Sequence, residues 1–98
     1  MRRADAIAKL RQLKPLLDRH GVERLRVFGS VARDEAGDAS DIDLIVDYIN
    51  KPDLLKFIGL QHALADALGI EVDLTTLDGL RPELRDEILA EAIDAEAA

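Results

Sequence analysis

The chain has 98 residues, which is the length of one domain and too short for a second, substrate-holding domain. It contains 13 Lys and Arg against 20 Asp and Glu, and the formal net charge of -7 disfavours a protein that binds nucleic acid by neutralising phosphates. The absence of cysteine excludes a disulfide framework, a zinc–thiolate site and a cysteine nucleophile. No apolar run approaches about 18 residues and the first segment is amphipathic, so we expect no membrane association and a cytoplasmic location.

The first part of the chain predicts two helices followed by a strand. Apolar residues recur every three or four positions from Ile7 onward, which is the pattern of an amphipathic helix. Pro15 lacks an amide hydrogen and clashes with the preceding turn, so we expect the helix to break there and a second short helix to end at Gly21. Residues 22–28 alternate apolar and polar side chains and predict a strand that runs into a turn.

Strand and helix patterns alternate through the rest of the chain. They predict a short helix at 30–35, a loop at 36–40, a strand at 41–49, a helix at 53–68, a strand at 70–77 and a last helix from about 82. The apolar sides of the two longer helices are expected to be buried: Leu54, Phe57, Ile58, Leu64 and Leu68 in the first, and Leu84, Ile88, Leu89 and Ile93 in the second. This order predicts an α/β (α+β) fold, a small mixed β-sheet flanked by helices, in a single domain over residues 1–98.

A glycine and a serine stand where the first predicted strand turns into the short helix. Glycine lets a ligand approach the backbone closely, and free amides at the start of a helix favour an anion. The hydroxyl of Ser30 adds a further donor, so Gly29 and Ser30 are candidates for binding a phosphate. A tight turn with a serine helix cap is the alternative explanation of the same two residues.

Two aspartates, Asp41 and Asp43, begin the second predicted strand on one face. Aspartate is a poor strand former and like charges side by side repel each other, so local propensity disfavours this pair. A divalent cation such as Mg²⁺ converts the repulsion into shared ligation, which makes the pair a candidate metal site. A solvated strand edge is the alternative.

A third carboxylate is expected from the next strand. Asp73 lies between Val72 and Leu74, which should face the core, so on a neighbouring strand its carboxylate can meet those of the first two aspartates. Three such carboxylates can hold two ions roughly 3.5–4 Å apart, as in phosphoryl-type transfer. Glu71 has the same strand parity, and periodicity does not decide between it and Asp73.

The segment from Gly29 to Val46, GSVARDEAGDASDIDLIV, resembles the signature of the nucleotidyltransferase superfamily related to DNA polymerase beta. More narrowly, nearly the whole chain resembles the minimal nucleotidyltransferase (MNT) antitoxins that accompany HEPN-domain ribonuclease toxins. The likeness rests on the helix-rich start, the Gly-Ser turn, the Asp-x-Asp strand, the middle helix, the isolated VDL strand and the ending LRPELRDEILAEAI.

This resemblance implies an enzyme that transfers AMP from ATP to a hydroxyl, which in such antitoxins belongs to a tyrosine of the toxin. It implies Mg²⁺, as two ions, a HEPN-family toxin as the partner, and no direct contact with nucleic acid. Carried over by position, Gly29 and Ser30 would hold the triphosphate. Asp41 and Asp43 would ligate Mg²⁺, and Asp73 would be the third carboxylate, which activates the acceptor hydroxyl.

Arg33 and Asp34, which follow the Gly-Ser turn, are also expected to affect nucleotide binding. Arg33 matches the arginine that follows the turn in this family and would stabilise phosphate charge, and pairing with Asp41, Glu35 or solvent is the alternative. Asp34 departs from the family, which commonly has glycine there. A carboxylate so close to a triphosphate would weaken nucleotide binding unless it points away.

Two other functions are compatible with the sequence. An antitoxin that only occupies its toxin needs no transfer chemistry, but it has no reason to keep an Asp pair that disfavours a strand. A transferase for a small molecule would need more chain to enclose its substrate. We therefore expect a catalytic antitoxin.

Overall fold

The computed structural model describes residues 1–35, 37 and 41–95. The helices are α1 (Arg3–Gln12), α2 (Lys14–Arg19), α3 (Gly29–Ala32), α4 (Leu54–Leu68) and α5 (Pro82–Glu91), and a 3₁₀ turn, η1, covers Leu77–Gly79. The strands are β1 (Val22–Phe28), β2 (Ile42–Tyr48), β3 (Val72–Thr75) and β4 (Ile93–Asp94). The loop predicted at 36–40 lies, apart from Gly37, outside the described residues.

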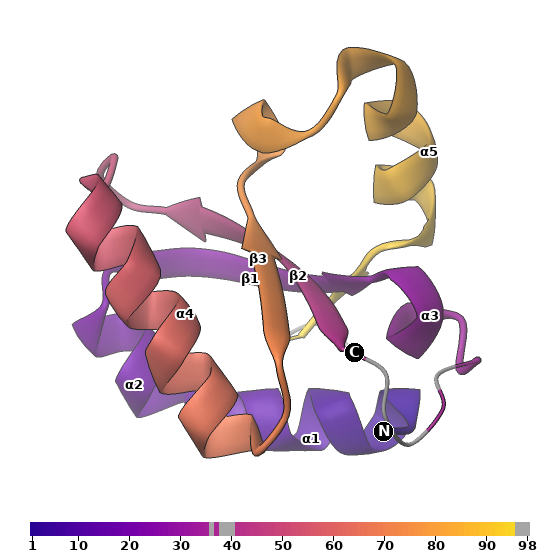
Figure 1. The fold of residues 1–98 in the computed structure, drawn as a ribbon, viewed down its shortest axis with the longest axis horizontal. Coiled ribbons are helices and arrows are strands. Elements are labelled where there is room, and N and C mark those ends of the chain that lie inside the picture. Colours follow the sequence, from indigo (N-terminus) through magenta and orange to yellow (C-terminus); the bar gives the residue numbers. More distant parts are fainter. Residues whose placement is uncertain (36, 38–40, 96–98) are drawn as a thin grey trace.

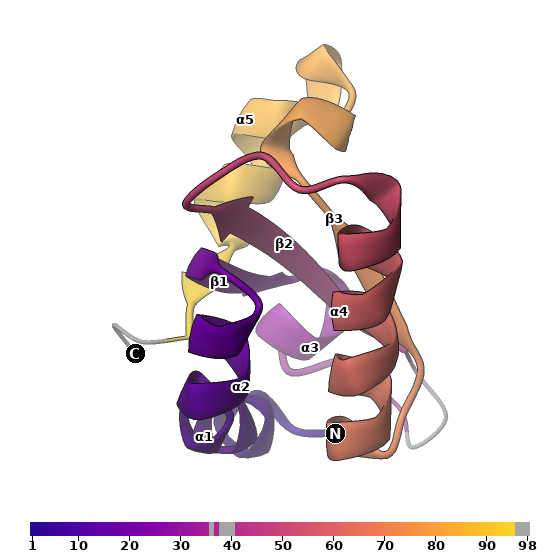
Figure 2. The same ribbon diagram turned by 90° about the vertical axis from the view of Figure 1, so that its left-hand side faces the viewer.

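The strands form one mixed sheet in the order β3-β2-β1-β4. β1 is antiparallel to both β2 and β4, whereas β2 and β3 are parallel. In both views α1 and α2 lie below the sheet, α5 lies above it, and α4 runs alongside β3 (Figure 1, Figure 2). A small mixed sheet flanked by helices confirms the predicted fold class.

The main core lies between the sheet and the helices α1, α2 and α4. Ile42 and Leu44, alternate residues of β2, are completely buried there together with Leu64 of α4. Successive side chains of a strand point to opposite faces, so Asp43 is turned to the other face of the sheet. That is the side on which α5 lies (Figure 1).

The helix ends follow the local sequence signals. Pro15 lies in the first turn of α2, after the break from α1, as predicted. Asp53 caps α4 by accepting a hydrogen bond from the Lys56 amide at 2.8 Å, and Gly69 follows the helix in the left-handed conformation, with φ of 71°. In the described part of the chain, no helix is long and apolar enough to cross a membrane.

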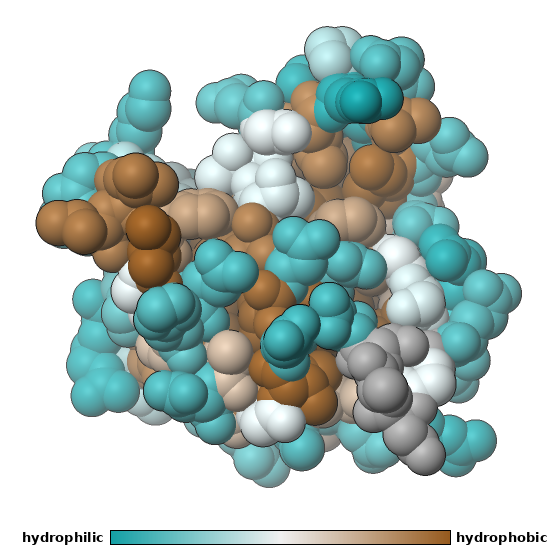
Figure 3. Space-filling model, in the orientation of Figure 1, coloured by the Kyte–Doolittle hydropathy of each residue, from teal (hydrophilic) through white to brown (hydrophobic). Residues whose placement is uncertain are grey.

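The predicted buried side of α4 is wrong near the start of the helix. Leu54 and Ile58 are 72% and 37% exposed, and the buried residues of the helix are instead Leu60, Leu64 and Leu68. β3 has four residues where eight were predicted, so the sheet offers little surface for the first turns of α4 to cover. Figure 3 shows apolar side chains gathered at the surface where α4 begins.

The end of the chain also differs from the prediction. α5 ends at Glu91, and Ile93 belongs to β4, where it pairs with Val27 of β1. No residue of α5 is fully buried, and Leu84 is 41% exposed, so the expected buried face of this helix is wrong. The apolar spacing did not separate the helix from the short strand, because a two-residue strand is too short to show a period.

Candidate active site

Asp43 and Asp73 lie next to each other on the face of the sheet opposite the main core. Asp43 is the second residue of β2, and its register partner on the parallel strand β3 is Asp73. The residues that flank Asp43, Ile42 and Leu44, are completely buried, so the two aspartates face away from the core. The structure thus brings together two of the three carboxylates expected at the site.

The surroundings of Asp43 disfavour its negative charge. Burial is the first cause that raises the pKa of Asp43, followed by repulsion from Asp73, a hydrogen bond with Asp73 and repulsion from Asp41. The pKa rises from the ordinary value of 3.8 to about 6, although the positive charge of Arg33 lowers it. A cation shared by the two carboxylates would relieve this repulsion.

The turn between β1 and α3 brings the backbone of Gly29 against Asp43. Gly29 has φ of 73°, a left-handed conformation that residues with a side chain rarely adopt. A Cβ atom at this position would overlap Oδ2 of Asp43 and lie 3.2 Å from its Cγ. Phe28, the residue before the glycine, is the register partner of Asp43, which explains this proximity. Both the backbone angle and the close approach therefore require glycine here.

The other predicted site residues lie around this pair. Ser30 is the second residue of α3 and is half-buried. Asp41 precedes β2 and is exposed, so it does not begin the strand as predicted, although its charge still acts on Asp43. Glu71 and Asp73 are both exposed, but Glu71 precedes β3, whereas Asp73 lies in β3 as the register partner of Asp43. Strand register, which periodicity does not reveal, favours Asp73 over Glu71 as the neighbour of Asp43.

The donor atoms of the pair suit Mg²⁺. This ion prefers oxygen ligands and is commonly held by one or two carboxylates together with phosphate oxygens of a substrate and water. Asp43 and Asp73 supply two carboxylates of this kind. Among the described residues, no group of three or more His, Cys, Asp or Glu side chains is arranged to hold a metal ion. Phosphate oxygens and water would therefore have to complete the coordination.

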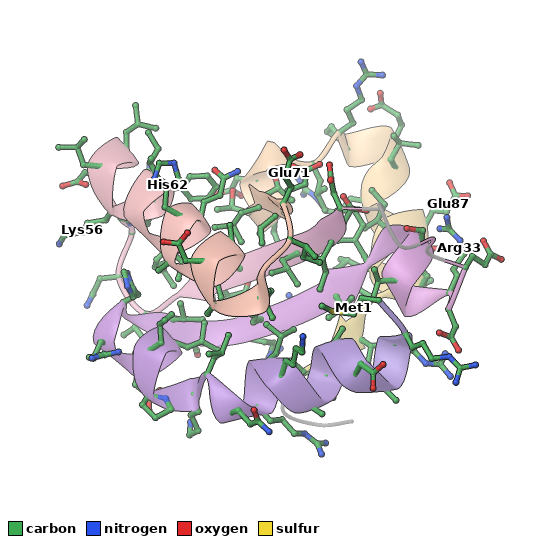
Figure 4. The ribbon with its side chains drawn as sticks, turned by 60° about the horizontal axis from the view of Figure 1, so that its bottom comes forward. Met1, Arg33, Lys56, His62, Glu71 and Glu87 are labelled. Carbon is green, nitrogen blue, oxygen red and sulfur yellow. The ribbon has the colours of Figure 1, made fainter. Side chains whose placement is uncertain are left out.

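Arg33 follows α3 and is held by two glutamates. Its Nε donates a hydrogen bond to Oε2 of Glu35 at 3.1 Å, and its Nη1 donates to Oε1 and Oε2 of Glu91 at 3.2 and 3.1 Å. The bond to Glu35 first, and then the bonds to Glu91, raise the pKa of Arg33. Figure 4 shows the side chain of Arg33 beside the ribbon of α5. Pairing with Glu35 was one of the alternatives predicted for this arginine.

Glu91 is absent from the residues predicted from the sequence. It is the last residue of α5, and its Oε1 accepts a hydrogen bond from the Gly29 amide at 3.2 Å as well as the bond from Arg33. The contact joins residues 62 positions apart. Glu91 stands among several other acidic residues near the end of the chain, so the sequence carries no signal for this contact.

Asp34 does not direct its carboxylate at the Gly29 turn. Its Oδ1 accepts a hydrogen bond at 3.1 Å from the amide of Arg3, the first residue of α1. Its φ is 59°, in the left-handed region where glycine is favoured, which gives a physical reason for the glycine that the family resemblance leads us to expect here. The carboxylate instead satisfies an amide at the start of a helix.

Residues 11–94 of the chain match the family described as Polymerase beta, Nucleotidyltransferase. The protein adenylyltransferase MntA of Thermococcus cleftensis is 41% identical over 80 residues, which cover 82% of this chain and 81% of that protein. A solved structure provisionally described as a minimal nucleotidyltransferase superposes with a TM-score of 0.81 at 43% identity and covers 95% of both chains. The chain belongs to the polymerase beta nucleotidyltransferase family, and its resemblance to minimal nucleotidyltransferases is confirmed.

Two solved complexes share the fold at lower identity. A crystal structure described as a toxin-antitoxin with AMP-PNP has a TM-score of 0.73 at 24% identity, covering 91% of this chain and 71% of that one. A structure described as tri-AMPylated Shewanella oneidensis HEPN toxin in complex with MNT antitoxin has a TM-score of 0.67 at 22% identity, covering 90% and 69%. At these identities the likeness establishes the fold.

Proposed function

We propose that this protein is a Mg²⁺-dependent adenylyltransferase that moves AMP from ATP to a hydroxyl group of a protein partner. The observation that carries the proposal is the pairing of Asp43 with Asp73 beside the Gly29 turn, in a chain of the nucleotidyltransferase family. Repulsion between two carboxylates, one of which is partly buried, destabilises the fold. A perturbed carboxyl of this kind, beside a specific charged neighbour, is typical of a functional site.

The proposed reaction joins the acceptor oxygen to the α-phosphorus of ATP. The bond between the α-phosphorus and its bridging oxygen breaks, and that oxygen leaves with pyrophosphate. Asp73, the more exposed member of the pair, accepts the proton of the acceptor hydroxyl. Asp43, which is half-buried, would be a ligand of Mg²⁺. Bound Mg²⁺ would neutralise the negative charge on the phosphate oxygens during this displacement.

Gly29, Ser30 and Arg33 are proposed to hold the triphosphate. Gly29 keeps the backbone open to a phosphate next to Asp43, and Ser30 offers a hydroxyl donor. A guanidinium has five N–H donors, and the glutamates engage Nε and Nη1 of Arg33. No described residue accepts a hydrogen bond from Nη2, which leaves this nitrogen to a phosphate.

The partner is proposed to be a HEPN-family toxin, with a tyrosine hydroxyl as the acceptor. The HEPN partner rests on the descriptions of related proteins, one an AMPylated HEPN toxin with an MNT antitoxin and another a protein adenylyltransferase. The tyrosine acceptor rests on the family resemblance alone. The AMP-PNP named in the other toxin-antitoxin complex supports ATP as the AMP donor. On this proposal the chain is an antitoxin that neutralises its partner by modifying it.

A second candidate is an antitoxin that acts only by binding. The observation that favours it is the set of exposed apolar residues at the start of α4, where Leu54 and Leu55 are 72% and 81% exposed beside Ile49, at 66%. Exposed apolar patches are common at protein contact sites (Figure 3). A binding surface of this kind serves a catalytic antitoxin equally well, and the Asp43–Asp73 pair favours the catalytic one.

The position of the transferred label tests the proposed reaction. The protein is incubated with Mg²⁺, the HEPN toxin proposed as its partner, and ATP labelled at either the α- or the γ-phosphate. Adenylyl transfer attaches the α label to the HEPN protein and releases the γ label in pyrophosphate. Attachment of the γ label would indicate phosphorylation instead, and attachment of neither label would leave the binding mode as the function.

A further inference from the structure

One carboxylate connects both ends of the short helix α3. Glu91 accepts a hydrogen bond from the amide of Gly29, the first residue of α3, and two from Arg33, the residue after its end. A helix of one turn is not stable by itself, so its position depends on such contacts. Hydrogen bonds between a carboxylate and a guanidinium are among the stronger ones in proteins. Glu91 therefore helps to fix where α3, with Ser30 on it, lies relative to the sheet.

Glu91 is itself held firmly with respect to the sheet. Two residues after it, β4 pairs with β1 through Ile93 and Val27. The amide of Ala95 then donates a hydrogen bond to the carbonyl of Leu25 at 3.0 Å. β1 leads directly into α3, so β1, α3, Glu91 and β4 form a closed ring of covalent and hydrogen-bonded links. Within this ring, the side chain of Glu91 is 31% exposed.

We infer that Glu91 is a positioning residue for the nucleotide: it holds the Gly29 turn and orients Arg33 so that the free Nη2 faces the triphosphate. This inference rests on the proposed function, because it assigns the turn and the arginine to ATP. Glu91 and Glu35 together fix Nε and Nη1 of Arg33, and no described residue accepts a hydrogen bond from Nη2. A side chain held in this way loses less conformational entropy when a phosphate binds.

The opposite role has a distinct signature. If Glu91 instead competed with the phosphates for Gly29 and Arg33, its removal would strengthen ATP binding. Removal of a positioning residue weakens ATP binding. The sign of the change in KM for ATP therefore separates the two roles.

The kinetic experiment uses Glu91→Gln with the full chain, its partner protein and Mg²⁺-ATP. The amide keeps the shape and one acceptor oxygen but loses the charge that orients Arg33. We expect KM for ATP to rise about tenfold, with a much smaller fall in kcat, because a hydrogen bond to a charged group is lost. Asp94→Asn is the matched control: Asp94 lies three residues after Glu91, and its carboxylate pairs with Arg24 of β1 at 3.2 Å. Its KM should stay within about twofold of wild type.

A second readout needs no nucleotide. In Glu91→Gln the amide of Gly29 loses a charged acceptor, and in Glu91→Ala it loses its acceptor altogether. Hydrogen exchange at Gly29 should therefore be faster in both variants than in wild type, while the amide of Ala95 keeps its rate. Unchanged exchange at Gly29, or a wild-type or lower KM for ATP in Glu91→Gln, would overturn the inference. A wild-type protein that neither binds Mg²⁺-ATP nor transfers AMP would overturn the proposed function instead, and the exchange rates would still decide whether Glu91 holds the turn. If Glu91→Ala does not fold, Glu91→Gln alone decides both readouts.

Discussion

Asp43 of β2 and Asp73 of β3 are register partners on parallel strands, and the negative charge of Asp73 helps to raise the pKa of the Asp43 carboxyl group. Burial and this repulsion bring the pKa of Asp43 to about 6. The fold therefore carries an unfavourable interaction at the point where the family's chemistry is expected. Removing one charge separates what the pair costs in stability from what it contributes to function.

Asp43→Asn should stabilise the metal-free protein near neutral pH and abolish transfer. Below about pH 3.8 the carboxyl is protonated in both the folded and the unfolded state, so it carries no penalty. Between about pH 4 and 6 the unfolded state releases its proton first, and the folded state loses stability as the pH rises. Thermal melts of both proteins from pH 3.5 to 7.5 should show a Tm advantage of the variant that appears across this interval. A variant that is less stable than wild type at pH 7 would show that Asp43 is a structural residue.

Mg²⁺ with ATP should raise the Tm of the wild type and raise that of Asp43→Asn much less. A ligand that binds only the folded state stabilises it by RT ln(1 + [L]/Kd), and a neutral amide is a poor ligand for Mg²⁺. The measurement is the shift in Tm over a series of Mg²⁺-ATP concentrations. Equal shifts in the two proteins would remove Asp43 from the proposed metal site.

Gly29→Ala should destabilise the protein more than Gly21→Ala. Both glycines have φ of 73°, but a Cβ at Gly21 has no atom within 4 Å, whereas a Cβ at Gly29 overlaps Oδ2 of Asp43. The backbone angle alone costs about 1–2 kcal/mol, which is the expected loss for Gly21→Ala. Gly29→Ala should lose more stability than this, because the new Cβ must also displace Asp43. The Gly29→Ala variant should therefore fail to bind Mg²⁺-ATP. Urea unfolding measures the stability of the two variants, and nucleotide titration measures their binding of Mg²⁺-ATP. Equal losses of stability in Gly29→Ala and Gly21→Ala would contradict the close approach of Gly29 to Asp43.

Asp34→Gly should be nearly neutral, whereas Asp34→Ala should destabilise. Glycine removes the strain of φ 59° but also the hydrogen bond to the Arg3 amide, and these effects of about 1 kcal/mol each offset one another. Alanine keeps the strained angle and loses the hydrogen bond, at a cost of about 0.5–2 kcal/mol. KM for ATP should not change in either variant, because the carboxylate points to α1. A clear gain in ATP binding with glycine would mean that Asp34 acts on the nucleotide.

Leu55→Lys and Leu64→Ala should differ sharply although both lie in α4. Leu55 is 81% exposed and Leu64 is completely buried. A change at an exposed position typically alters stability by no more than about 0.5 kcal/mol, while truncation of a buried leucine costs about 2–5 kcal/mol. Urea unfolding of the two variants measures this directly. Comparable losses would mean that the first turns of α4 are covered by the chain itself.

The features that the sequence predicted well have local causes. Pro15, Asp53 and Gly69 act on neighbouring backbone groups, so the ends of α1, α2 and α4 follow from single residues. The same holds for Ile42 and Leu44, whose alternation places Asp43 on the opposite face. These signals suffice for the fold class and for the glycine and aspartate candidates.

The features that were missed depend on tertiary contacts. Periodicity gave Glu71 and Asp73 the same face, and only the register of β3 against β2 distinguishes them. Glu91 meets Gly29 from 62 positions away, through a helix end and a two-residue strand. The exposed start of α4 follows from the length of β3, which the apolar pattern overestimated. Each of these outcomes is set by the packing of segments that are distant in sequence.

The mass of the partner protein tests the central claim most directly. The chain is incubated with the HEPN toxin proposed as its partner, ATP and Mg²⁺, and intact masses are measured for wild type, Asp43→Asn and Asp73→Asn. The account predicts that wild type adds one or more adenylyl groups to the partner, that chelation of Mg²⁺ prevents this, and that neither variant adds any. A partner of unchanged mass whose toxicity is nevertheless suppressed by wild type, or a variant that transfers AMP at the wild-type rate, would contradict it.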